Sequence, residues 1–251
     1  MYNLMIGIGI IIGIIIFEHI CSKKGVPKHQ IDNLMLVICI SIVFGFFSAA
    51  LFDKLVHYHS FKAFLSHLFV FTGLTFAGGF WGGAIVFIIS YKIVMRNFKN
   101  IKLHINCAAP SIAIAHSFGR IGCFLGGCCF GKPTHSIIGV QFPAGSLAEQ
   151  FYEYKVKVIP TQLIEALFLL LLFFVLYFLL QKHAFSFYLL FYGVFRFIIE
   201  FFRGDNRGTM FQTIFTPSQC LSILMIFLGL WILYRSILLK HNTQKIILSS
   251  R

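Results

Sequence analysis

Charged residues are scarce in this sequence. Asp, Glu, Lys and Arg make up only 12% of the 251 residues, whereas hydrophobic residues make up 58%. A chain of this size cannot hide so much apolar surface in a water-soluble core, which excludes an ordinary soluble protein. Long polar stretches are lacking too, so we expect no soluble domain beside the apolar segments. The composition predicts an integral membrane protein.

Acidic residues are particularly few, with 8 Asp and Glu against 21 Lys and Arg and a net charge of +13. Such an imbalance can indicate a nucleic-acid-binding protein. Here, however, the cations fall in short clusters between apolar runs instead of forming one basic face. Membrane topology and contact with anionic headgroups explain them better. We therefore expect the lipid bilayer, and not nucleic acid, as the partner of these charges.

The apolar runs also lack the alternation of a transmembrane barrel strand. The 32 Phe residues fall in runs such as FFVLYFLL and FIIEFF, which is typical of helices. We expect an all-α fold with a single membrane domain over residues 1–251. Segments long enough to span a bilayer are found at about 2–17, 33–52, 67–91, 105–122, 162–181, 184–202 and 218–239. The first has no basic leader or small-residue cleavage site, so we expect it to be retained.

The distribution of Lys and Arg predicts the orientation of these seven helices. With the N-terminus outside and the C-terminus inside, the inner connections hold more Lys and Arg residues than the outer ones. The long connection 123–161 then lies on the outer face, and residues 240–251 form a short inner tail. Because the outer connection is long and rich in Gly and Pro, it is expected to make tight turns near a ligand.

A stripe of polar residues runs along the sixth predicted span, in the sequence FYGVFRFIIEFFRGDNRG. Tyr192, Arg196 and Glu200 recur at four-residue spacing and Arg203 follows three later, which predicts one shared helical face. One interpretation is an ion pair that only fixes helix packing. The other is a phosphate site, because two guanidinium groups around one carboxylate leave an unneutralised positive charge.

The fourth predicted span ends in AHSFGRIGCFLGGCCFGKPT. His116 and Arg120 lie one helical turn apart, and the helix then breaks into a glycine-rich segment that includes Gly126. Exposed backbone N–H groups in such a break, beside Arg120, are suited to binding an anion. His116 is either a packing residue or a functional neighbour of Arg120.

Three of the seven cysteines lie close together in the sequence, at Cys123, Cys128 and Cys129. Adjacent cysteines fit one tetrahedral metal site poorly, and neither a second CxxC nor an obvious His completes it. We therefore expect no metal. A disulfide on the outer face remains open, and the interpretation we favour is tight packing of small residues in a turn.

The motifs GRIGCFLGGCCFGKPT, IPTQLIEAL and YGVFRFIIEFFRGDNRG, in this order, resemble successive blocks of the bacterial prolipoprotein diacylglyceryl transferases. Weaker likeness extends to YNLM near the start, to TGLTFAGGFWGG and to PSQCLSI, so the resemblance covers most of the chain. It implies a multi-pass enzyme of the bacterial plasma (inner) membrane, with seven helices and the N-terminus outside.

The resemblance also implies a reaction without a metal or soluble cofactor. The diacylglyceryl group of phosphatidylglycerol would pass to the lipobox cysteine of a preprolipoprotein, with release of glycerol phosphate. Arg120 would grip the lipid headgroup, and Arg196, Glu200 and Arg203 would form a second polar wall. Tyr2 would line the site, as would Cys123, Gly126 and Tyr192 in the matching motifs.

The sequence departs from the family pattern at several positions. Ala77 stands where the family usually has a His in its Gly-rich third span, and Cys123 stands where an Asn commonly follows GRxG. The usual Arg of the second span is absent from GFFSAALFDK. We take His116 as a substitute for the missing acid or base. The alternatives are a paralogue that serves another acceptor or lipid, and a non-catalytic protein that binds or transports lipid.

Overall fold

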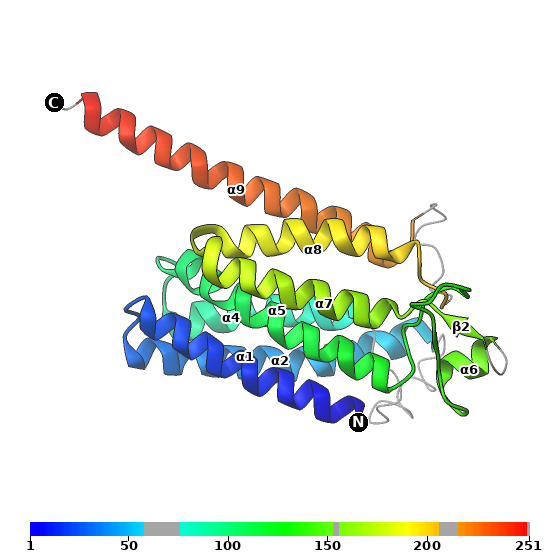
Figure 1. Ribbon diagram of the computed structural model, residues 1–251. Helices are drawn as coiled ribbons and strands as arrows, with labels where there is room; N and C mark the ends of the chain where they lie inside the picture. Colours follow the sequence, from blue (N-terminus) through cyan, green and yellow to red (C-terminus); the bar gives the residue numbers. More distant parts are fainter. Residues whose placement is uncertain (58–75, 153–155, 206–214, 250–251) are drawn as a thin grey trace. The chain divides into compact units, whose positions relative to one another are not determined.

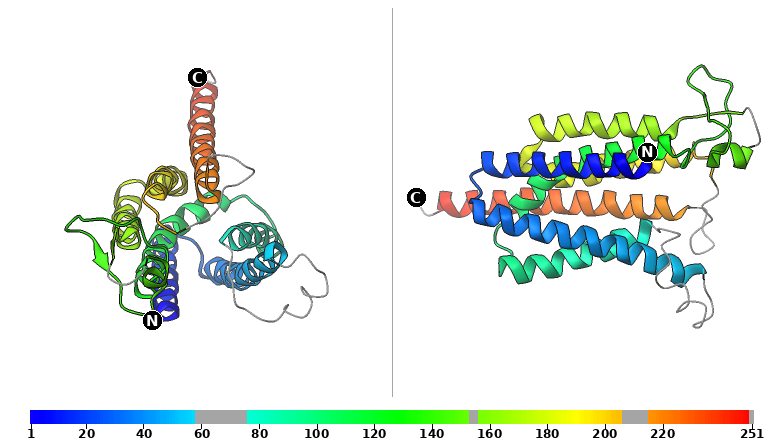
Figure 2. Two further views of the ribbon diagram at one scale, coloured as in Figure 1. Left: turned by 90° about the vertical axis from the view of Figure 1, so that its right-hand side faces the viewer. Right: turned by 90° about the horizontal axis from the view of Figure 1, so that it is seen from below.

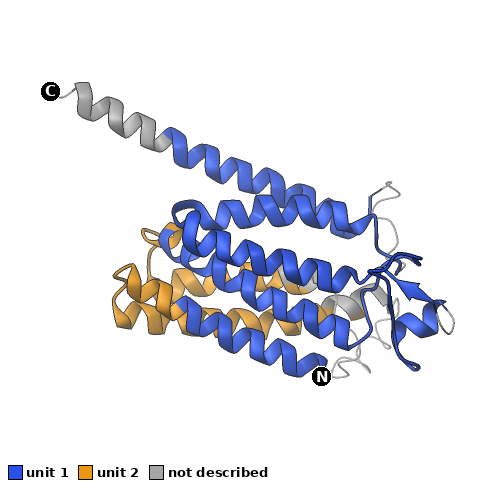
Figure 3. Cartoon of the chain, in the orientation of Figure 1, with its two compact units in different colours: residues 1–17, 103–251 blue, residues 18–102 orange. Residues whose placement is uncertain are grey.

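The computed structural model describes residues 1–57, 76–152, 156–205 and 215–249, and its chain is shown in Figure 1. The chain divides into two compact units, coloured separately in Figure 3. Unit 1 comprises Met1–Phe17 and Leu103–Arg251, and unit 2 comprises Glu18–Lys102. All the site residues named above except Ala77 belong to unit 1.

Unit 1 is built from long helices and a small irregular region between two of them. Its helices are most of α1 (Tyr2–Lys23) and of α5 (Ile101–Leu125), then α6 (Leu147–Tyr152), α7 (Thr161–Phe174), α8 (Ala184–Glu200) and α9 (Pro217–Ser249). A π-helical turn, η1 (Val175–Leu179), and a 3-10 turn, η2 (Gln181–His183), connect α7 to α8. The strands β1 (Val140–Gln141) and β2 (Lys157–Val158) pair antiparallel between α5 and α7.

The ends of these helices bring distant parts of unit 1 together. The end of α5, the start of α7 and the end of α8 lie at one end of the unit, beside α6 and the β1–β2 ladder (Figures 1 and 2). Backbone hydrogen bonds join this region, since Gly131 N donates to Ile159 O at 2.9 Å and Lys132 N donates to Phe202 O at 2.9 Å. The predicted site motifs, at the ends of α5 and α8, therefore meet.

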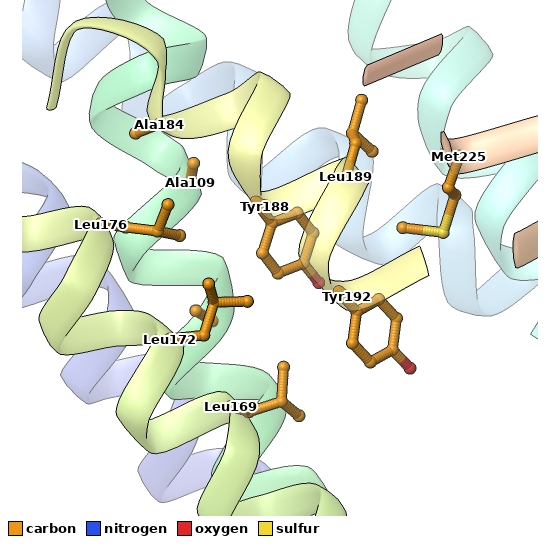
Figure 4. Packing of buried hydrophobic residues seen from close by; sticks show 10 residues of the cluster. Ala109, Leu169, Leu172, Leu176, Ala184, Tyr188, Leu189, Tyr192 and Met225 are labelled. Carbon is orange, nitrogen blue, oxygen red and sulfur yellow. The ribbon is translucent and has the colours of Figure 1, made fainter. Parts of the chain in front are cut away.

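The core of unit 1 is formed where α5, α7, α8 and α9 pack together (Figure 4). Leu169, Leu172 and Leu176 contribute apolar side chains from α7 and η1, and Tyr188 and Tyr192 contribute from α8. Both tyrosines present an apolar ring to this cluster and carry a hydroxyl group that needs a hydrogen-bond partner. The two tyrosines therefore belong both to the apolar core and, through their hydroxyl groups, to a polar network.

Unit 2 contains α2 (Lys28–His57) and α4 (Phe76–Met95), which pack against each other. The contact uses glycines on both helices. A Cβ added at Gly45 would lie 3.4 Å from Gly79 O and 3.5 Å from Gly83 Cα. Small residues of this kind let membrane helices approach closely, which produces good packing without polar groups.

The structure confirms a helical membrane protein. Within the described residues, five helices are long and apolar enough to cross a membrane, and Trp81–Met95 is a shorter apolar helix. Residues 67–75 of the predicted third span lie outside the described residues. The predicted fourth span corresponds to α5. Its buried residues include His104, Asn106 and Ser111, so these polar side chains are covered by other parts of the protein.

One expectation about the fold needs correction. The all-α prediction omitted the short β1–β2 ladder, which forms because the long connection between α5 and α7 folds back on itself. Residues 240–249, which the sequence assigns to a short inner tail, are helical because α9 continues to Ser249, and their place on the inner side of the membrane stays a prediction. Apolar residues recur after Lys240 in the sequence QKIILS, which allows the helix to continue.

Candidate active site

Arg120 and Glu165 form the centre of the candidate site. Arg120 is on the last turns of α5, and its Nη2 lies 3.0 Å from Glu165 Oε1 on α7. The Tyr192 hydroxyl on α8 donates a hydrogen bond of 2.8 Å to the same oxygen. The Glu165 side chain is completely buried, with 0% exposure. One carboxylate therefore fixes an arginine and a tyrosine from two other helices.

His116 lies one turn before Arg120 and extends this network toward α8. Its Nδ1 lies 3.3 Å from the Tyr188 hydroxyl and its Nε2 lies 3.5 Å from the Tyr192 hydroxyl. Ser117 Oγ donates a hydrogen bond of 2.8 Å to Ala166 O, which holds α5 against α7. The structure therefore brings Tyr192 to His116 and to the Arg120–Glu165 pair, which the sequence did not predict.

Arg196 and Glu200 form a second ion pair, as their spacing on one helical face predicts. Arg196 Nη2 lies 2.7 Å from Glu200 Oε2, and both residues are buried. Arg196 Nη2 also donates to Ser218 Oγ at 3.0 Å, and Thr216 Oγ1 donates to Glu200 Oε1 at 2.9 Å. The pair thus links the end of α8 to the start of α9.

The predicted grouping of Arg203 with Glu200 is wrong. Arg203 instead forms two hydrogen bonds of 2.8 Å with the carboxylate of Asp205, from Nε and from Nη2. The reason is that α8 ends at Glu200, so the helical spacing no longer applies to Arg203. Arg203 lies in a backbone bridge with Gly131, which carries its side chain toward the segment after α5.

Each of the three arginines keeps a buried N–H donor without a hydrogen-bond partner among the described residues. These donors are Arg120 Nε, Arg196 Nη1 and Arg203 Nη1. A buried donor without an acceptor is costly, and native structures contain few of them. Guanidinium groups bind phosphate and carboxylate oxygens through such donors. The arrangement can therefore hold an oxyanion.

Shared neighbours connect the three arginines. Arg120 and Arg196 both lie within electrostatic range of Glu165 and of His116. Arg120 and Arg203 both act on the thiol of Cys129. That Arg120 and Arg196 face one polar site stays a prediction of the sequence, with which these shared neighbours are compatible.

The glycine break, where the sequence predicts an anion site, lies close to the start of α1. A Cβ added at Gly122 would lie 3.2 Å from Tyr2 O, and one added at Gly126 would lie 3.7 Å from the Cβ of Tyr2. Gly127 adopts φ +65°, and a Cβ there would come within 2.8 Å of Ser146 Cβ. Tyr2 therefore packs against the break, and a side chain at Gly122 would press against it. That Tyr2 lines a substrate site stays a prediction.

Cys123, Cys128 and Cys129 also come together at this break. Their three Sγ atoms lie within 4.8 Å of one another. Cys129 lies outside the helices, and hydrogen bonds from the thiols of Cys123 and Cys128 lower the pKa of its thiol. Burial opposes this shift in pKa, while the positive charges of Arg203 and Arg120 add to it.

Sequence reasoning missed Glu165, Asp205, Thr216 and Ser218. Glu165 could have been found in the apolar run IPTQLIEALFLLLLFF. A carboxylate inside a membrane helix costs free energy, so its presence there indicates a functional residue or one with an ion-pair partner. Asp205, Thr216 and Ser218 carry no comparable signal. They lie at the surface end of α8 and α9, where polar residues are ordinary.

Apolar helices that enclose buried arginines, carboxylates and tyrosines define a helical membrane protein with an internal polar site. The model of the family described as prolipoprotein diacylglyceryl transferase matches residues 1–235, and this chain belongs to that family.

Individual relatives agree with this family. The chain is 33% identical over 236 residues to a phosphatidylglycerol–prolipoprotein diacylglyceryl transferase of Clostridium tetani, covering 92% of this chain and 90% of that protein. It is 30% identical over 242 residues to a transferase of the same name, numbered 2, of Clostridium perfringens, with 91% and 88% coverage. A Francisella tularensis transferase of this name is 31% identical over 244 residues, with 92% and 87% coverage.

Proposed function

We propose that this chain transfers the diacylglyceryl group of phosphatidylglycerol to the lipobox cysteine thiol of preprolipoproteins and releases glycerol phosphate. The observation that carries the proposal is the set of three spare guanidinium donors, on Arg120, Arg196 and Arg203. Phosphatidylglycerol offers a phosphodiester whose oxygens are acceptors for such donors. The names of the relatives, which specify this lipid and prolipoprotein, support the same conclusion.

In this proposal the arginines act on the departing phosphate. The sulfur of the acceptor attacks the glycerol carbon that carries the phosphate ester, a C–S bond forms, and the C–O bond to phosphate breaks. Negative charge grows on the phosphate as it leaves, so prearranged cationic donors lower the barrier. Arg120 is the central donor because Glu165 and Tyr192 fix its position. Arg196, held by Glu200 and Ser218, supplies the opposite side.

Proton transfer is assigned to His116. The acceptor thiol loses a proton and the glycerol phosphate can take one up, so one group must move it. His116 contacts the hydroxyl groups of Tyr188 and Tyr192 at 3.3 and 3.5 Å, which gives it hydrogen-bonded neighbours that reach Glu165. Tyr2, Cys123 and Gly126 are proposed to line the path of the substrates at the glycine break, and Tyr192 lines it from α8.

The finer topology belongs to the same proposal. Seven membrane-spanning helices, with the N-terminus outside and the C-terminus inside, would place the α6 and β1–β2 region on the outer face of the bacterial plasma membrane. The lipobox cysteine would then meet the lipid there. The five long apolar helices and the excess of Lys and Arg in the predicted inner segments support this arrangement. The whole chain, residues 1–251, would act as one membrane domain.

The test uses the purified protein in detergent with phosphatidylglycerol and a synthetic lipobox peptide. Mass spectrometry should detect a peptide heavier by one diacylglyceryl group, bound as a thioether, together with free glycerol phosphate. A peptide with Ser in place of its cysteine is the control and should remain unmodified. Consumption of lipid without the thioether product would indicate a different acceptor. Lipid binding without any product would indicate a non-catalytic protein.

A further inference from the structure

The amide of Gln162, on the first turn of α7, uses its donor and leaves its acceptor over. Gln162 Nε2 donates to Cys128 O at 2.6 Å. This bond identifies the two ends of the amide, because a carbonyl oxygen accepts only from the nitrogen end. The other end, Gln162 Oε1, is buried and has no hydrogen-bond partner among the described residues. The residue is completely buried, so this acceptor is removed from bulk solvent.

Glu165 presents a second acceptor of the same kind. Arg120 Nη2 and the Tyr192 hydroxyl both bind its Oε1, at 3.0 and 2.8 Å. Its Oε2 is buried without a hydrogen-bond partner in the part of the chain that the structure describes. Residues three apart are neighbours on one face of a helix. Gln162 Oε1 and Glu165 Oε2 are therefore two acceptor atoms on one face of α7.

Both acceptors belong to side chains that are held in place by the protein. Complete burial and the bond to Cys128 O fix Gln162. Next to Glu165, Ser117 Oγ donates to Ala166 O at 2.8 Å, so the ion pair with Arg120 is the second contact that joins α5 to α7. Binding groups that are ordered in advance lose less entropy when a ligand arrives. The two acceptors are thus suited to selecting a ligand.

The groups without partners indicate what kind of ligand they bind. Arg120 Nε, a buried donor without a partner among the described residues, belongs to the same ion pair as Glu165. Phosphate oxygens satisfy such a donor, but they cannot satisfy Gln162 Oε1 or Glu165 Oε2, which need an O–H or N–H group. A phosphate ester that also carries hydroxyl groups supplies both. The headgroup of phosphatidylglycerol is such a group, because its glycerol has hydroxyls on two neighbouring carbons.

The charges around these acceptors favour a neutral donor over a cationic one. Gln162 carries no charge, and the charge of Glu165 is matched by Arg120. Arg196 also lies within electrostatic range of Glu165. An ammonium group, as in phosphatidylethanolamine, would meet both guanidinium groups, and like charges repel strongly where water is excluded. A hydroxyl group donates a hydrogen bond without adding positive charge.

We propose that Gln162 determines lipid specificity: its Oε1, together with Glu165 Oε2, accepts hydrogen bonds from the headgroup hydroxyls and so selects phosphatidylglycerol. This inference rests on the proposed function and deepens it, because that function assigns the arginines to the phosphate and leaves the rest of the headgroup unassigned. A site built to bind a hydroxyl rejects an analogue that lacks it, since the buried acceptor is then left unpaired. Gln162 thus acts on the choice of lipid and not on the reacting carbon.

The first experiment compares three lipids in the transfer assay with the unaltered protein. Phosphatidylpropanol lacks both hydroxyls but keeps the diacylglyceryl group, the phosphate charge and the C–O bond that breaks. Its kcat/KM should be at least about tenfold lower than that of phosphatidylglycerol. Phosphatidylethanolamine should be no better than phosphatidylpropanol. Equal kcat/KM for phosphatidylglycerol and phosphatidylpropanol would overturn the proposal, and equal kcat/KM for phosphatidylglycerol and phosphatidylethanolamine would overturn the preference for a neutral donor.

The second experiment assigns the discrimination to Gln162. Gln162→Met should lower the ratio of kcat/KM for phosphatidylglycerol to that for phosphatidylpropanol by about fivefold, because one acceptor is lost. The matched control is Thr161→Val, since Thr161 Oγ1 donates to Cys129 O at 2.9 Å and holds the same glycine break. Thr161→Val should lower transfer from both lipids alike and keep the ratio.

Two results would contradict the assignment to Gln162. They are an unchanged ratio in Gln162→Met, and an equal fall of the ratio in Gln162→Met and Thr161→Val, which would show that Gln162 only holds the glycine break. Size exclusion in detergent shows whether both variants fold. The comparison of lipids with the unaltered protein needs no variant, so it decides the proposal even where Gln162→Met does not fold.

Lipid binding separates this inference from the proposed function. Native mass spectrometry of the purified protein measures how much phosphatidylglycerol and phosphatidylpropanol it retains. A preference for phosphatidylglycerol that Gln162→Met loses, without any thioether product, would support the inference and overturn the transferase function. Thioether formed equally well from both lipids would overturn the inference and leave the transferase function standing. The same preference in binding and in transfer would support both.

Discussion

The guanidinium group of Arg120 lies 3.0 Å from the carboxylate of Glu165, and this carboxylate is completely buried. Two charges removed from solvent in this way rarely add stability, because their attraction only partly offsets the cost of desolvation. The ion pair nevertheless holds Arg120 at its Nη2 atom, while Arg120 Nε has no hydrogen-bond partner among the described residues. We interpret Glu165 as a positioning residue for Arg120.

Removing the Glu165 carboxylate should destabilise the protein more than removing both charges. Glu165→Leu leaves Arg120 as an uncompensated buried cation, which should cost about 3–5 kcal/mol in the free energy of unfolding. The double variant Arg120→Met with Glu165→Leu should recover most of that loss. Thermal unfolding in detergent, followed by size exclusion, measures both effects. Additive losses in the double variant would show that the two residues are not coupled.

The transfer assay gives the same variants a second readout. The double variant should regain stability but remain inactive, because Arg120 itself is proposed to hold the phosphate. Tyr192→Phe removes one hydrogen bond to Glu165 and should cost only about 0.5–1.5 kcal/mol. Activity in the double variant would contradict the role of Arg120.

Arg196→Lys keeps the positive charge but loses the planar arrangement of donors. We expect kcat/KM to fall about tenfold to a hundredfold, because a charge-assisted hydrogen bond contributes about 1.5–3 kcal/mol. Arg235→Lys is the matched control, since Arg235 lies over the ring of Trp231 on α9, far along the chain from the site. It should transfer like the original protein. Equal activity of Arg196→Lys and Arg235→Lys would exclude bidentate binding by Arg196.

His116→Ala and His116→Gln test proton transfer. If His116 moves the proton, both variants should lose about a hundredfold or more in kcat, since general acid–base catalysis contributes at least that much. The dependence of kcat on pH should also flatten, which a purely structural role would not cause. Tyr188→Phe removes only the hydroxyl group that contacts His116 Nδ1 and should have a smaller effect. Full activity of His116→Ala would show that the assignment is wrong.

Gly131→Ala should disturb the junction between α5, α7 and α8. A Cβ there would lie 2.6 Å from Ile159 O and 2.9 Å from Phe202 O, which are backbone atoms that cannot rotate away. We expect a loss of about 1–3 kcal/mol in stability, together with reduced transfer, because Arg203 is bridged to Gly131. Gly7→Ala is the matched control, as nothing lies within 4 Å of its added Cβ. A stable, active Gly131→Ala protein would contradict this account.

The agreement between sequence and structure is best within single helices. The spacing of Arg196 and Glu200 predicted an ion pair, and the structure has it at 2.7 Å. The apolar runs predicted the helices, and the last predicted span, 218–239, agrees with the apolar part of α9 that is long enough to cross a membrane, Pro217–Leu238. Such predictions succeed because four residues complete about one helical turn, so neighbours on a helix are fixed by local geometry.

The predictions fail where a helix ends. The grouping of Arg203 with Glu200 assumed that α8 continues, but α8 stops at Glu200 and Arg203 turns to Asp205. The helical spacing argument therefore holds only as far as the last residue of the helix.

The sequence by itself determined that this is a helical membrane protein of the prolipoprotein diacylglyceryl transferase family with arginines inside its apolar helices. The length of the apolar segments and the order of the motifs suffice for that, because both can be read along the chain without knowing how its segments pack. Only the tertiary structure decided that Glu165 is the partner of Arg120 and that three cysteine sulfurs meet at the glycine break. These contacts join different helices and turns, and the distance between such segments depends on packing, which no local repeat in the sequence encodes.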